Sequence, residues 1–394
     1  MSARRRARSV AFVALAVAAG CAPRGQIVFD PAAATVGARE QVFVSTARAP
    51  VAGPELYGHD RKAPPDFAIF DVAVPPRRDA GTVTFPDPRH PDPETQFLVT
   101  SARRFAGEPE FRAAMNAALA ADPSGEAEAM VFVHGFNVNF AEGVLRHAQI
   151  QHDYDRHDVA VLFSWPSAAK TWRYFDDRES ALFARRALEE TIASVASSDA
   201  RQFNLVAHSM GAFLLMDTFS TMMRLGYDEA ERKINAIFLL APDIDLDVFK
   251  EEARPILERG VPIVVFASKH DEALRISAWL RGEHDRLGSL RDESELGGLP
   301  VTIYDITEVE AGDPLDHFAA ATSPALLALF RNLRHSDDFW EYTPPPGART
   351  VGYVIRPTPG AAEIALDEDQ TAPPRLPRAA NPATPRIDRA EPAR

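Results

Sequence analysis

Asn204-Leu-Val-Ala-His-Ser-Met-Gly-Ala212 is the stretch that decides the fold. Its apolar run leads directly into Ser209, and apolar residues at helical spacing follow without a break. This order predicts a buried strand, a sharp turn and a helix, with the Ser209 hydroxyl at the positive end of the helix. Small residues are needed on both sides of such a serine, because a larger side chain would strike the neighbouring strand or helix. Gly211 meets this need after the serine, and Ala207 stands where a glycine is usual.

Ser209 in this setting is predicted to be a catalytic nucleophile. The alternative is a serine that only caps the following helix, which would give a similar local pattern. The upstream stretch Val131-Phe-Val-His-Gly-Phe-Asn137 is predicted to be a strand that ends at a His-Gly turn. Gly135 would let the backbone approach a reacting oxygen closely. The backbone N–H groups of Phe136 and Met210 are therefore the predicted oxyanion hole.

The acid that accompanies such a serine is expected further along the chain, in the order serine, acid, histidine. Val264-Val-Phe-Ala-Ser-Lys-His-Asp271 is a buried strand that runs into a polar loop ending in aspartate, so Asp271 is the predicted acid. Asp243 and Asp245 follow the preceding strand and are the rival choice. An aspartate without a catalytic role is expected to cap a helix or to form a salt bridge.

The base is expected after the last predicted strand, which ends near Ile306. Only His317 and His335 follow that point. His317 lies in Asp313-Pro-Leu-Asp-His-Phe318, a loop that precedes a helical stretch, and His335 lies beyond that helix. His317 is therefore the predicted base, and the alternative is a histidine on a surface loop.

Short apolar runs recur along the middle of the chain, and helical stretches separate most of them. This alternation predicts an α/β fold with a mostly parallel central sheet and helices on both faces. Two helical stripes of apolar residues, within 184–195 and 212–223, are expected to face the core. The apolar runs lie at 130–133, 159–163, 203–206, 236–240, 261–267 and 301–306.

The segment before these runs is less regular. Period-two alternation and β-branched residues predict strands over 41–45, 67–74 and 94–101, and helical spacing predicts a helix over 108–121. Six prolines within residues 75–96 predict a loop there.

The N-terminus has the order of an export signal. Residues 1–9 are basic, Val10 to Ala19 form an apolar run, and Gly20-Cys21 follows. The run is too short to span a bilayer as a mature helix, which needs about 20 residues. The order is similar to a bacterial lipoprotein signal, in which lipid is attached to the cysteine that becomes the new N-terminus. Ala18 stands where such signals usually have leucine.

Cys21 is therefore predicted to carry a lipid anchor and to place an exported chain on a membrane. The alternative is a plain secretory signal in which Cys21 is incidental. Ala22 is not the aspartate that often marks retention in the inner membrane, so the outer membrane or the periplasmic side is the expected location.

The composition narrows the range of partners. A formal net charge of −13 over 394 residues disfavours nonspecific attraction to nucleic acid or to anionic lipid. A single cysteine excludes an intrachain disulfide and a thiolate zinc cluster. The predicted site contains no metal motif and no glycine-rich phosphate loop, so no cofactor is expected. Asp176 and Asp177 are expected to cap the following helix rather than to bind metal.

The ordered motifs resemble the bacterial α/β-hydrolases grouped as domain of unknown function 900. The resemblance covers roughly residues 40–335. It implies an α/β-hydrolase fold and a serine hydrolase activity, without naming a substrate. The motifs are Val44-Ser-Thr-Ala-Arg48, His134-Gly-Phe-Asn137, Phe163-Ser-Trp-Pro-Ser167, Tyr174-Phe-Asp-Asp177, Ala207-His-Ser-Met-Gly211, Ala241-Pro-Asp243, Ser268-Lys-His-Asp271 and Arg286-Leu-Gly288.

Two hypotheses of function follow. The first is an ester hydrolase that forms an acyl-enzyme on Ser209 with a small-molecule or lipid-like acyl ester. The second is a membrane-anchored binding or envelope protein on a hydrolase scaffold that has lost catalysis. Trp165 follows a buried strand at the expected active-site edge, where it could line the acyl pocket or pack in the core.

The expected organisation has four parts. Residues 1–20 are the signal peptide, and residues 21–39 are a tether of small and polar residues. Residues 40–340 form the α/β-hydrolase domain. Residues 341–394 are a Pro-, Ala- and Arg-rich tail that is expected to be disordered.

Overall fold

The structure is a computed structural model that describes residues 24–271, 273–274, 277, 285–290, 292–309, 318–333, 350–358 and 361–366. Two of the predicted functional residues, Cys21 and His317, lie outside the described residues, as does the predicted signal peptide.

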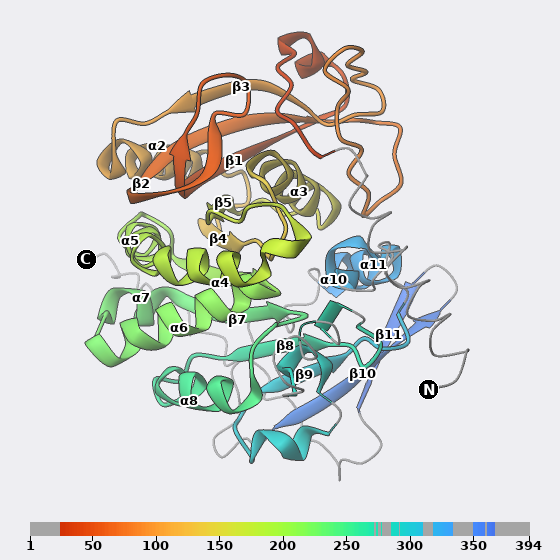
Figure 1. The fold of residues 1–394 in the computed structure, drawn as a ribbon. Coiled ribbons are helices and arrows are strands. Elements are labelled where there is room, and N and C mark those ends of the chain that lie inside the picture. The colour runs from red at the N-terminus through yellow and green to blue at the C-terminus, as the bar shows by residue number, and fades with distance from the viewer. Residues whose placement is uncertain are drawn as a thin grey trace, which may run out of the picture.

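A single mixed sheet of eleven strands runs through the described residues (Figure 1), in the order β11-β10-β9-β8-β7-β6-β4-β5-β1-β2-β3. The strands from β10 to β1 pair in parallel, whereas β2, β3 and β11 are antiparallel additions at the two margins. The predicted mostly parallel sheet is confirmed. The strands are β1 Ala38–Pro50, β2 Tyr57–Val74, β3 Leu98–Arg104, β4 Glu128–Val133, β5 Val159–Ser164, β6 Gln202–His208, β7 Ile234–Leu240, β8 Ile263–Ala267, β9 Thr302–Asp305, β10 Val351–Thr358 and β11 Ala361–Leu366.

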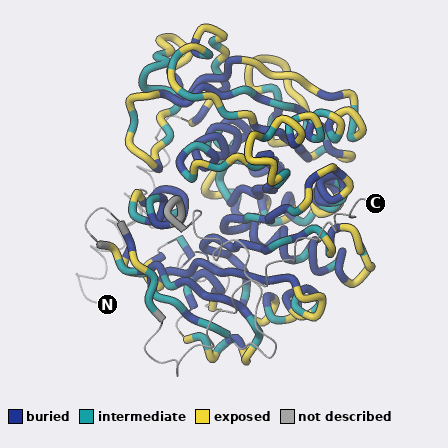
Figure 2. Tube along the Cα trace, turned by 180° about the vertical axis from the view of Figure 1, so that it is seen from behind, coloured by how far each residue is buried: buried dark blue, intermediate teal, exposed yellow. Residues whose placement is uncertain are grey.

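Helices cover both faces of this sheet. Successive side chains of a strand point to opposite sides, so the apolar side chains of a buried strand need a cover on each face. One face packs against α2, α5, α6 and α8, and Leu205 of β6 lies in that core. The other face packs against α3, α10 and α11, and Phe132 of β4 and Phe238 of β7 lie there. Figure 2 shows buried residues through the interior of the fold, and the strands from β4 to β8 are buried over almost all of their length. The helices are α2 Glu108–Ala121, α3 Phe140–Asp153, α4 Tyr174–Phe183, α5 Arg185–Ala196, α6 Met210–Leu225, α7 Asp228–Lys233, α8 Leu246–Leu257, α10 Ala319–Thr322 and α11 Pro324–Leu333, with 3₁₀ turns η1 Pro31–Thr35, η2 Thr171–Arg173, η3 Leu287–Ser289 and η4 Glu293–Leu296.

The N-terminal segment differs from the expected tether. From Arg24 onward it is docked on the domain: Ile27 is buried, and the N–H of Asp30 bonds to the carbonyl of Val99 at 2.9 Å. The turn η1 and the start of β1 complete the packing before residue 39. Composition alone could not show this, because the contacts come from partners distant in the sequence.

The C-terminal boundary of the hydrolase domain also differs from the expected one at residue 340. Strands β10 and β11 lie within the predicted tail, and β10 pairs with β9 to extend the parallel sheet. The local residues have strand propensity, with Val351, Tyr353, Val354 and Ile355 close together. The Pro-, Ala- and Arg-rich composition of the whole tail obscured this signal. Disorder in the remaining tail stays a prediction, since those residues are not described.

Candidate active site

The carboxyl ends of the parallel strands meet at one edge of the sheet, and Ser209 lies there between β6 and α6. Its backbone has φ 52° and ψ −121°, a conformation that costs a residue with a side chain about 1–3 kcal/mol. Three backbone hydrogen bonds hold it. The Ser209 N–H donates to the Leu240 carbonyl at 3.0 Å, and the Ser209 carbonyl accepts from Ala212 at 3.0 Å and from Asp243 at 3.2 Å. The side chain makes no capping bond to α6, so the capping alternative finds no support.

Gly211 lets the first turn of α6 lie directly on the end of β4. A Cβ atom at this position would stand 2.3 Å from the His134 carbonyl oxygen and 2.6 Å from that of Val133. Both contacts are backbone atoms that cannot move aside. The small residue predicted after the serine is therefore required by close packing of backbone on backbone.

The loop after β4 lies against the nucleophile. A Cβ atom on Gly135 would stand 3.0 Å from the Ser209 Cβ and 2.5 Å from Nδ1 of His208. The next residue, Phe136, packs its ring edge-on to Tyr174 of α4, with centroids 5.3 Å apart. Met210 is fully buried at the start of α6. The structure thus brings the two predicted oxyanion residues to the same edge as Ser209.

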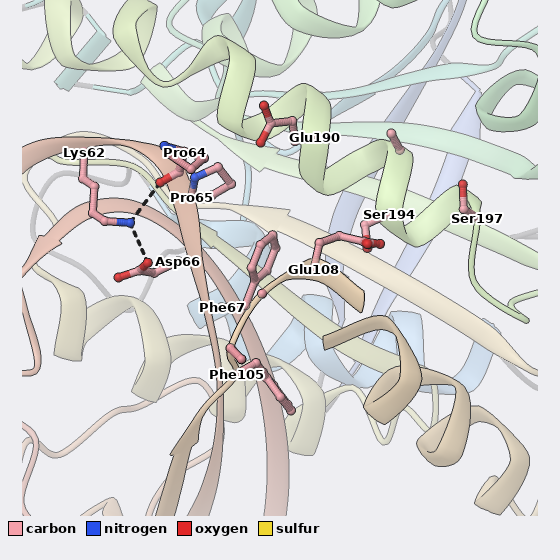
Figure 3. Close-up of a pocket in the computed structure, with 13 residues that line it drawn as sticks. Lys62, Pro64, Pro65, Asp66, Phe67, Phe105, Glu108, Glu190, Ser194 and Ser197 are labelled. Carbon is pink, nitrogen blue, oxygen red and sulfur yellow. Dashed lines mark hydrogen bonds and ion pairs between the residues drawn. The ribbon is translucent and has the colours of Figure 1, made fainter. Parts of the chain in front are cut away.

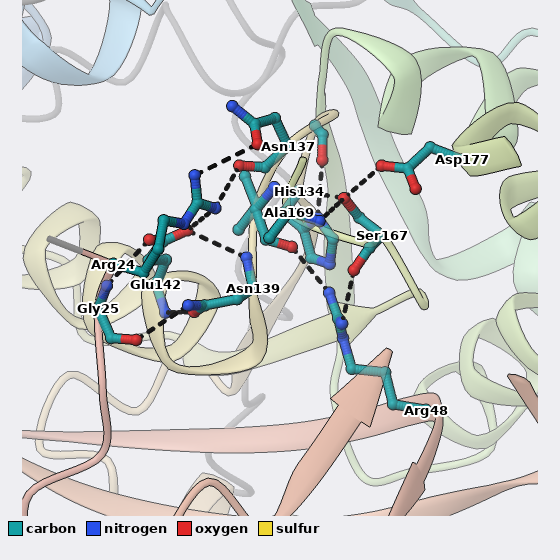
Figure 4. A network of polar contacts seen from close by, with 12 residues as sticks. Arg24, Gly25, Arg48, His134, Asn137, Asn139, Glu142, Ser167, Ala169 and Asp177 are labelled. Atoms are coloured by element: carbon teal, nitrogen blue, oxygen red, sulfur yellow. Dashed lines mark hydrogen bonds and ion pairs between the residues drawn. The ribbon is translucent and has the colours of Figure 1, made fainter. Parts of the chain in front are cut away.

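Asn137 ends this loop and is held from two sides (Figure 4). On one side, the Arg24 guanidinium donates from Nη2 to the Asn137 carbonyl at 2.8 Å and from Nη1 to its Oδ1 at 3.2 Å. Arg24 also pairs with Glu142 at 2.6 Å. On the other side, the Asn137 N–H is one of the groups that stabilise the Asp177 carboxylate. Asn137 has φ 58°, which asparagine tolerates better than most residues.

Arg48 is the buried support beneath this loop, and the sequence did not reveal its role. It is 1 % exposed and donates to the Ser164 hydroxyl at 2.9 Å and to the carbonyls of Ser167, Val138 and Gly58 at 2.9, 2.9 and 3.0 Å. Burial lowers the pKa of Arg48 to about 9, against the attraction of Asp177 and Glu142. It stays charged at neutral pH. The only signal in the sequence was its place at the end of the Val44–Arg48 motif.

His134 is near the nucleophile but is not a base. Burial, and then the charge of Arg48, lower the pKa of His134 to about 3. Its Nδ1 lies 2.9 Å from the Gly135 carbonyl, and its Nε2 lies 3.3 Å from the Ser164 hydroxyl. The ring is therefore neutral and fixed in the loop.

Trp165 stacks on His134 with centroids 5.1 Å apart, and its indole N–H donates to the His134 carbonyl at 2.7 Å. It is fully buried, at 0 % exposure. Of the two roles left open for Trp165, these contacts favour packing over contact with substrate.

Asp271 lies where the predicted acid was expected, in the loop after β8, and is fully buried. One of its carboxylate oxygens, Oδ1, accepts the Leu274 N–H at 2.9 Å. Its own N–H bonds to the Ser268 carbonyl at 3.3 Å, which closes a tight turn. A buried carboxylate at this edge can orient a histidine.

The rival aspartates are engaged elsewhere. Asp243 accepts the Tyr174 hydroxyl at 2.6 Å and the Ser277 hydroxyl at 2.7 Å, and lies 3.5 Å from Nε of Arg286. Asp245 caps α8 by accepting the N–H groups of residues 247 and 248. These are the structural roles expected for an aspartate without a part in catalysis.

The predicted base, His317, lies outside the described residues, but its neighbour Phe318 is described. The Phe318 ring packs on the His208 ring with centroids 4.1 Å apart. The residue after His317 therefore contacts the residue before Ser209.

No group of three or more His, Cys, Asp and Glu side chains that could hold a metal is found among the described residues. The Asp177 carboxylate does not cap α4, which is the role expected for it. Its carboxylate accepts the Ser167 hydroxyl at 2.6 Å and the Ala168 N–H at 2.8 Å, which fixes α4 on the loop after β5. Asp176 pairs with Arg173 at 2.8 Å in the same first turn.

A cavity of about 510 Å³ lies away from these residues, between β2, the turn before α2, and α5 (Figure 3). Phe67 and Phe105 line it together with an ion pair between Lys62 and Asp66. None of the predicted site residues borders it.

The comparison with protein families agrees with this architecture. Residues 108–334 match the model of the family described as alpha/beta hydrolase of unknown function (DUF900). No curated protein matches the sequence. Among solved structures, lipase B of Aspergillus fumigatus is 11 % identical with a TM-score of 0.35, over 63 % of this chain and 64 % of the lipase. An esterase of Rhizomucor miehei is 11 % identical with a TM-score of 0.29, over 70 % of this chain and 77 % of the esterase.

Proposed function

The chain belongs to the family of α/β-hydrolases of unknown function (DUF900), and from this premise we propose that it is a serine hydrolase that cleaves carboxylic esters. The observation that carries the proposal is the backbone of Ser209, whose φ of 52° is held by three hydrogen bonds at the active-site edge. A serine with only a structural role has no need of a conformation that costs free energy. The close packing of the Gly135 loop on the same residue supports a role for this loop in the oxyanion hole.

The proposed reaction is acyl transfer through Ser209. His317 removes the hydroxyl proton, and the serine oxygen attacks the ester carbonyl to form a tetrahedral intermediate. The Phe136 and Met210 N–H groups stabilise its oxyanion. The intermediate collapses, and the departing alkoxide takes the proton from His317. Water then repeats the sequence on the acyl-enzyme and releases the acid, while Asp271 orients the histidine throughout.

The choice of Asp271 over Asp243 rests on the neighbours of each carboxylate. Two hydroxyl donors and Arg286 surround Asp243, which leaves it committed to the packing of α4. Asp271 follows the next strand along the sheet and is buried at the same edge as Ser209. The contact between Phe318 and His208 supports His317 as the base, because Phe318 follows His317 in the sequence and His208 precedes Ser209.

A fluorophosphonate probe tests this function. The phosphorus reagent is expected to bond to Ser209 in the wild-type chain, with modification mapped to the peptide that contains it. The Ser209→Ala chain is the matched control and is expected to stay unlabelled. A folded wild-type chain that shows no labelling and no hydrolysis across an acyl ester panel would support the rival hypothesis, a binding protein on a hydrolase scaffold.

We also propose that the mature chain begins at a lipid-bearing Cys21 and faces the periplasm or the exterior. The order of basic segment, apolar run and Gly20-Cys21 supports this location. Among the residues that the structure describes, no helix has the length and apolar character that crossing a bilayer requires.

A further inference from the structure

Two large aromatic side chains stand in solvent where the loop after β5 enters α4. Trp172 is 76 % exposed in η2, and Phe175 is 59 % exposed in the first turn of α4. Phe183, at the end of the same helix, is 41 % exposed. Clustered exposed apolar side chains mark a surface that meets a partner. Trp172 and Phe175 are called the aromatic edge below.

The aromatic edge adjoins the proposed oxyanion loop. Tyr174 stands between them: its ring packs edge-on to Phe175 at 5.7 Å on one side and to Phe136 at 5.3 Å on the other. The Tyr174 hydroxyl is fixed by Asp243 at 2.6 Å, so this ring cannot turn away. Contact at the aromatic edge is therefore contact at the rim of the active site.

The chemistry of the aromatic edge fits a lipid surface. Lys170 is exposed, and its Nζ lies 6.0 Å from the centroid of the Trp172 ring. Tryptophan is enriched at the membrane–water interface, where its amphipathic ring sits at the headgroup level, and a neighbouring cation can meet a headgroup phosphate. Because the chain as a whole carries −13, a local cation matters for approach to an anionic leaflet.

The N-terminal segment arrives at the same loop. Arg24 binds Asn137, one residue after Phe136, and Cys21 lies three residues before Arg24 along the chain. A lipid on Cys21 would therefore enter the bilayer beside the rim that carries the aromatic edge. The lipid proposed on Cys21 and the aromatic edge would thus both lie close to the loop after β4.

We propose that the aromatic edge seats the active-site rim on the lipid bilayer, so that Ser209 receives acyl esters of membrane lipids from the leaflet. The proposal rests on the proposed ester hydrolysis for its substrate class. Docking itself depends only on Trp172, Phe175 and Lys170.

Docking is measured by fluorescence of the full-length lipidated protein in vesicles of phosphatidylethanolamine and phosphatidylglycerol with acyl-brominated lipid. Bromine quenches indole emission at short range. Wild-type protein is expected to emit less in vesicles with brominated lipid than in vesicles with plain lipid. The Trp172→Phe variant is expected to lose this difference, because Trp172 is the indole that the bromine quenches. If the Trp172 emission of the wild type is the same in brominated and in plain lipid, the proposal is overturned.

Substrate delivery is measured by comparing a vesicle-borne acyl ester with a short water-soluble ester. Trp172→Ser/Phe175→Ser is expected to lose roughly tenfold or more activity on the vesicle ester relative to the soluble one. Leu225→Ser is the matched control: Leu225 is 66 % exposed but ends α6, which begins next to Ser209 and runs away from it.

The outcomes separate the two proposals. Equal losses on both esters, or an equal loss in the Leu225 control, would overturn delivery by the aromatic edge. A wild-type chain that hydrolyses neither ester would refute the proposed function, while quenching of Trp172 would still report docking. If the double variant fails to fold, the quenching experiment with the conservative Trp172→Phe variant still tests the proposal.

Discussion

At the scale of single residues, the site is built from exceptions to ordinary backbone preference. Ser209 and Asn137 both have positive φ angles, at 52° and 58°, and Gly211 stands where no side chain fits. The roles of Ser209, Gly135 and Gly211 could be predicted from the sequence motifs, because the backbone conformation and close packing that they require arise from neighbouring residues. Arg48 was not readable, since its acceptors come from three separate chain segments.

Ser209→Ala is expected to lower kcat by several powers of ten, because loss of a nucleophile removes the covalent route. Ser209→Gly is expected to be equally inactive but more stable than the alanine variant, by about 1 kcal/mol, since glycine adopts this backbone without strain. Ester hydrolysis and thermal unfolding measure the two effects. More than a few per cent of residual activity in the alanine variant would contradict the assignment.

Asp271→Asn and Asp243→Asn are expected to fail in different ways. The first should lower kcat by about 10⁴-fold, as loss of the orienting carboxylate does in serine proteases. The second should chiefly lower the melting temperature, because it removes the charge that faces the buried Arg286. Steady-state kinetics together with calorimetry decide between them. If Asp243→Asn proves the more damaging to kcat, the acid follows β7 instead.

At the scale of elements, the contact between α6 and α8 encloses a carboxyl group. Burial, followed by the charge of Asp217, raises the pKa of Glu252 to about 8, against the nearby Arg178 and Arg224. Glu252 Oε2 has no hydrogen-bond partner within the described part of the chain. The folded protein keeps this proton at neutral pH, whereas the unfolded chain releases it at its ordinary pKa.

Glu252→Gln is therefore expected to stabilise the protein at neutral pH and above. Because the folded pKa is raised, the wild type loses stability as pH rises from about 4.5 towards 8. The variant lacks this loss, so its advantage should be near zero at pH 4 and on the order of 3 kcal/mol at pH 7. Chemical denaturation across pH measures the difference. A gap that does not change with pH would show that Glu252 titrates normally.

Helices and strands could be predicted where the sequence pattern that indicates them lies within the element itself. The helical stripes within α5 and α6 were predicted and are buried as expected, because amphipathic spacing reports directly on the core. The docking of residues 24–37 and the strands β10 and β11 were missed. The first segment bonds to β3 and β10 pairs with β9, partners distant in the sequence that composition does not reveal, while β11 is added as a hairpin on β10.

At the scale of the whole molecule, the proposed location on a membrane depends on the N-terminus. Cys21→Ser is expected to release the protein into the soluble fraction or to leave it unprocessed in the inner membrane, because the residue that accepts lipid is gone. Mass spectrometry of the wild-type N-terminus provides the direct measurement. An unmodified peptide that begins after residue 21 would make Cys21 incidental and leave the argument for Ser209 untouched.

The binding of Arg24 to Asn137 would also limit how far the protein can move from the proposed lipid anchor on Cys21. Only two residues separate Cys21 from Arg24, so their Cα atoms lie within about 11 Å of each other. With the proposed lipid on Cys21, a chain held through so short a segment would diffuse in two dimensions over its own leaflet. Its turnover should follow the mole fraction of substrate among the surrounding lipids. Turnover should slow when the substrate is diluted with inert lipid within the vesicles. It should not change when the same vesicles are diluted with buffer.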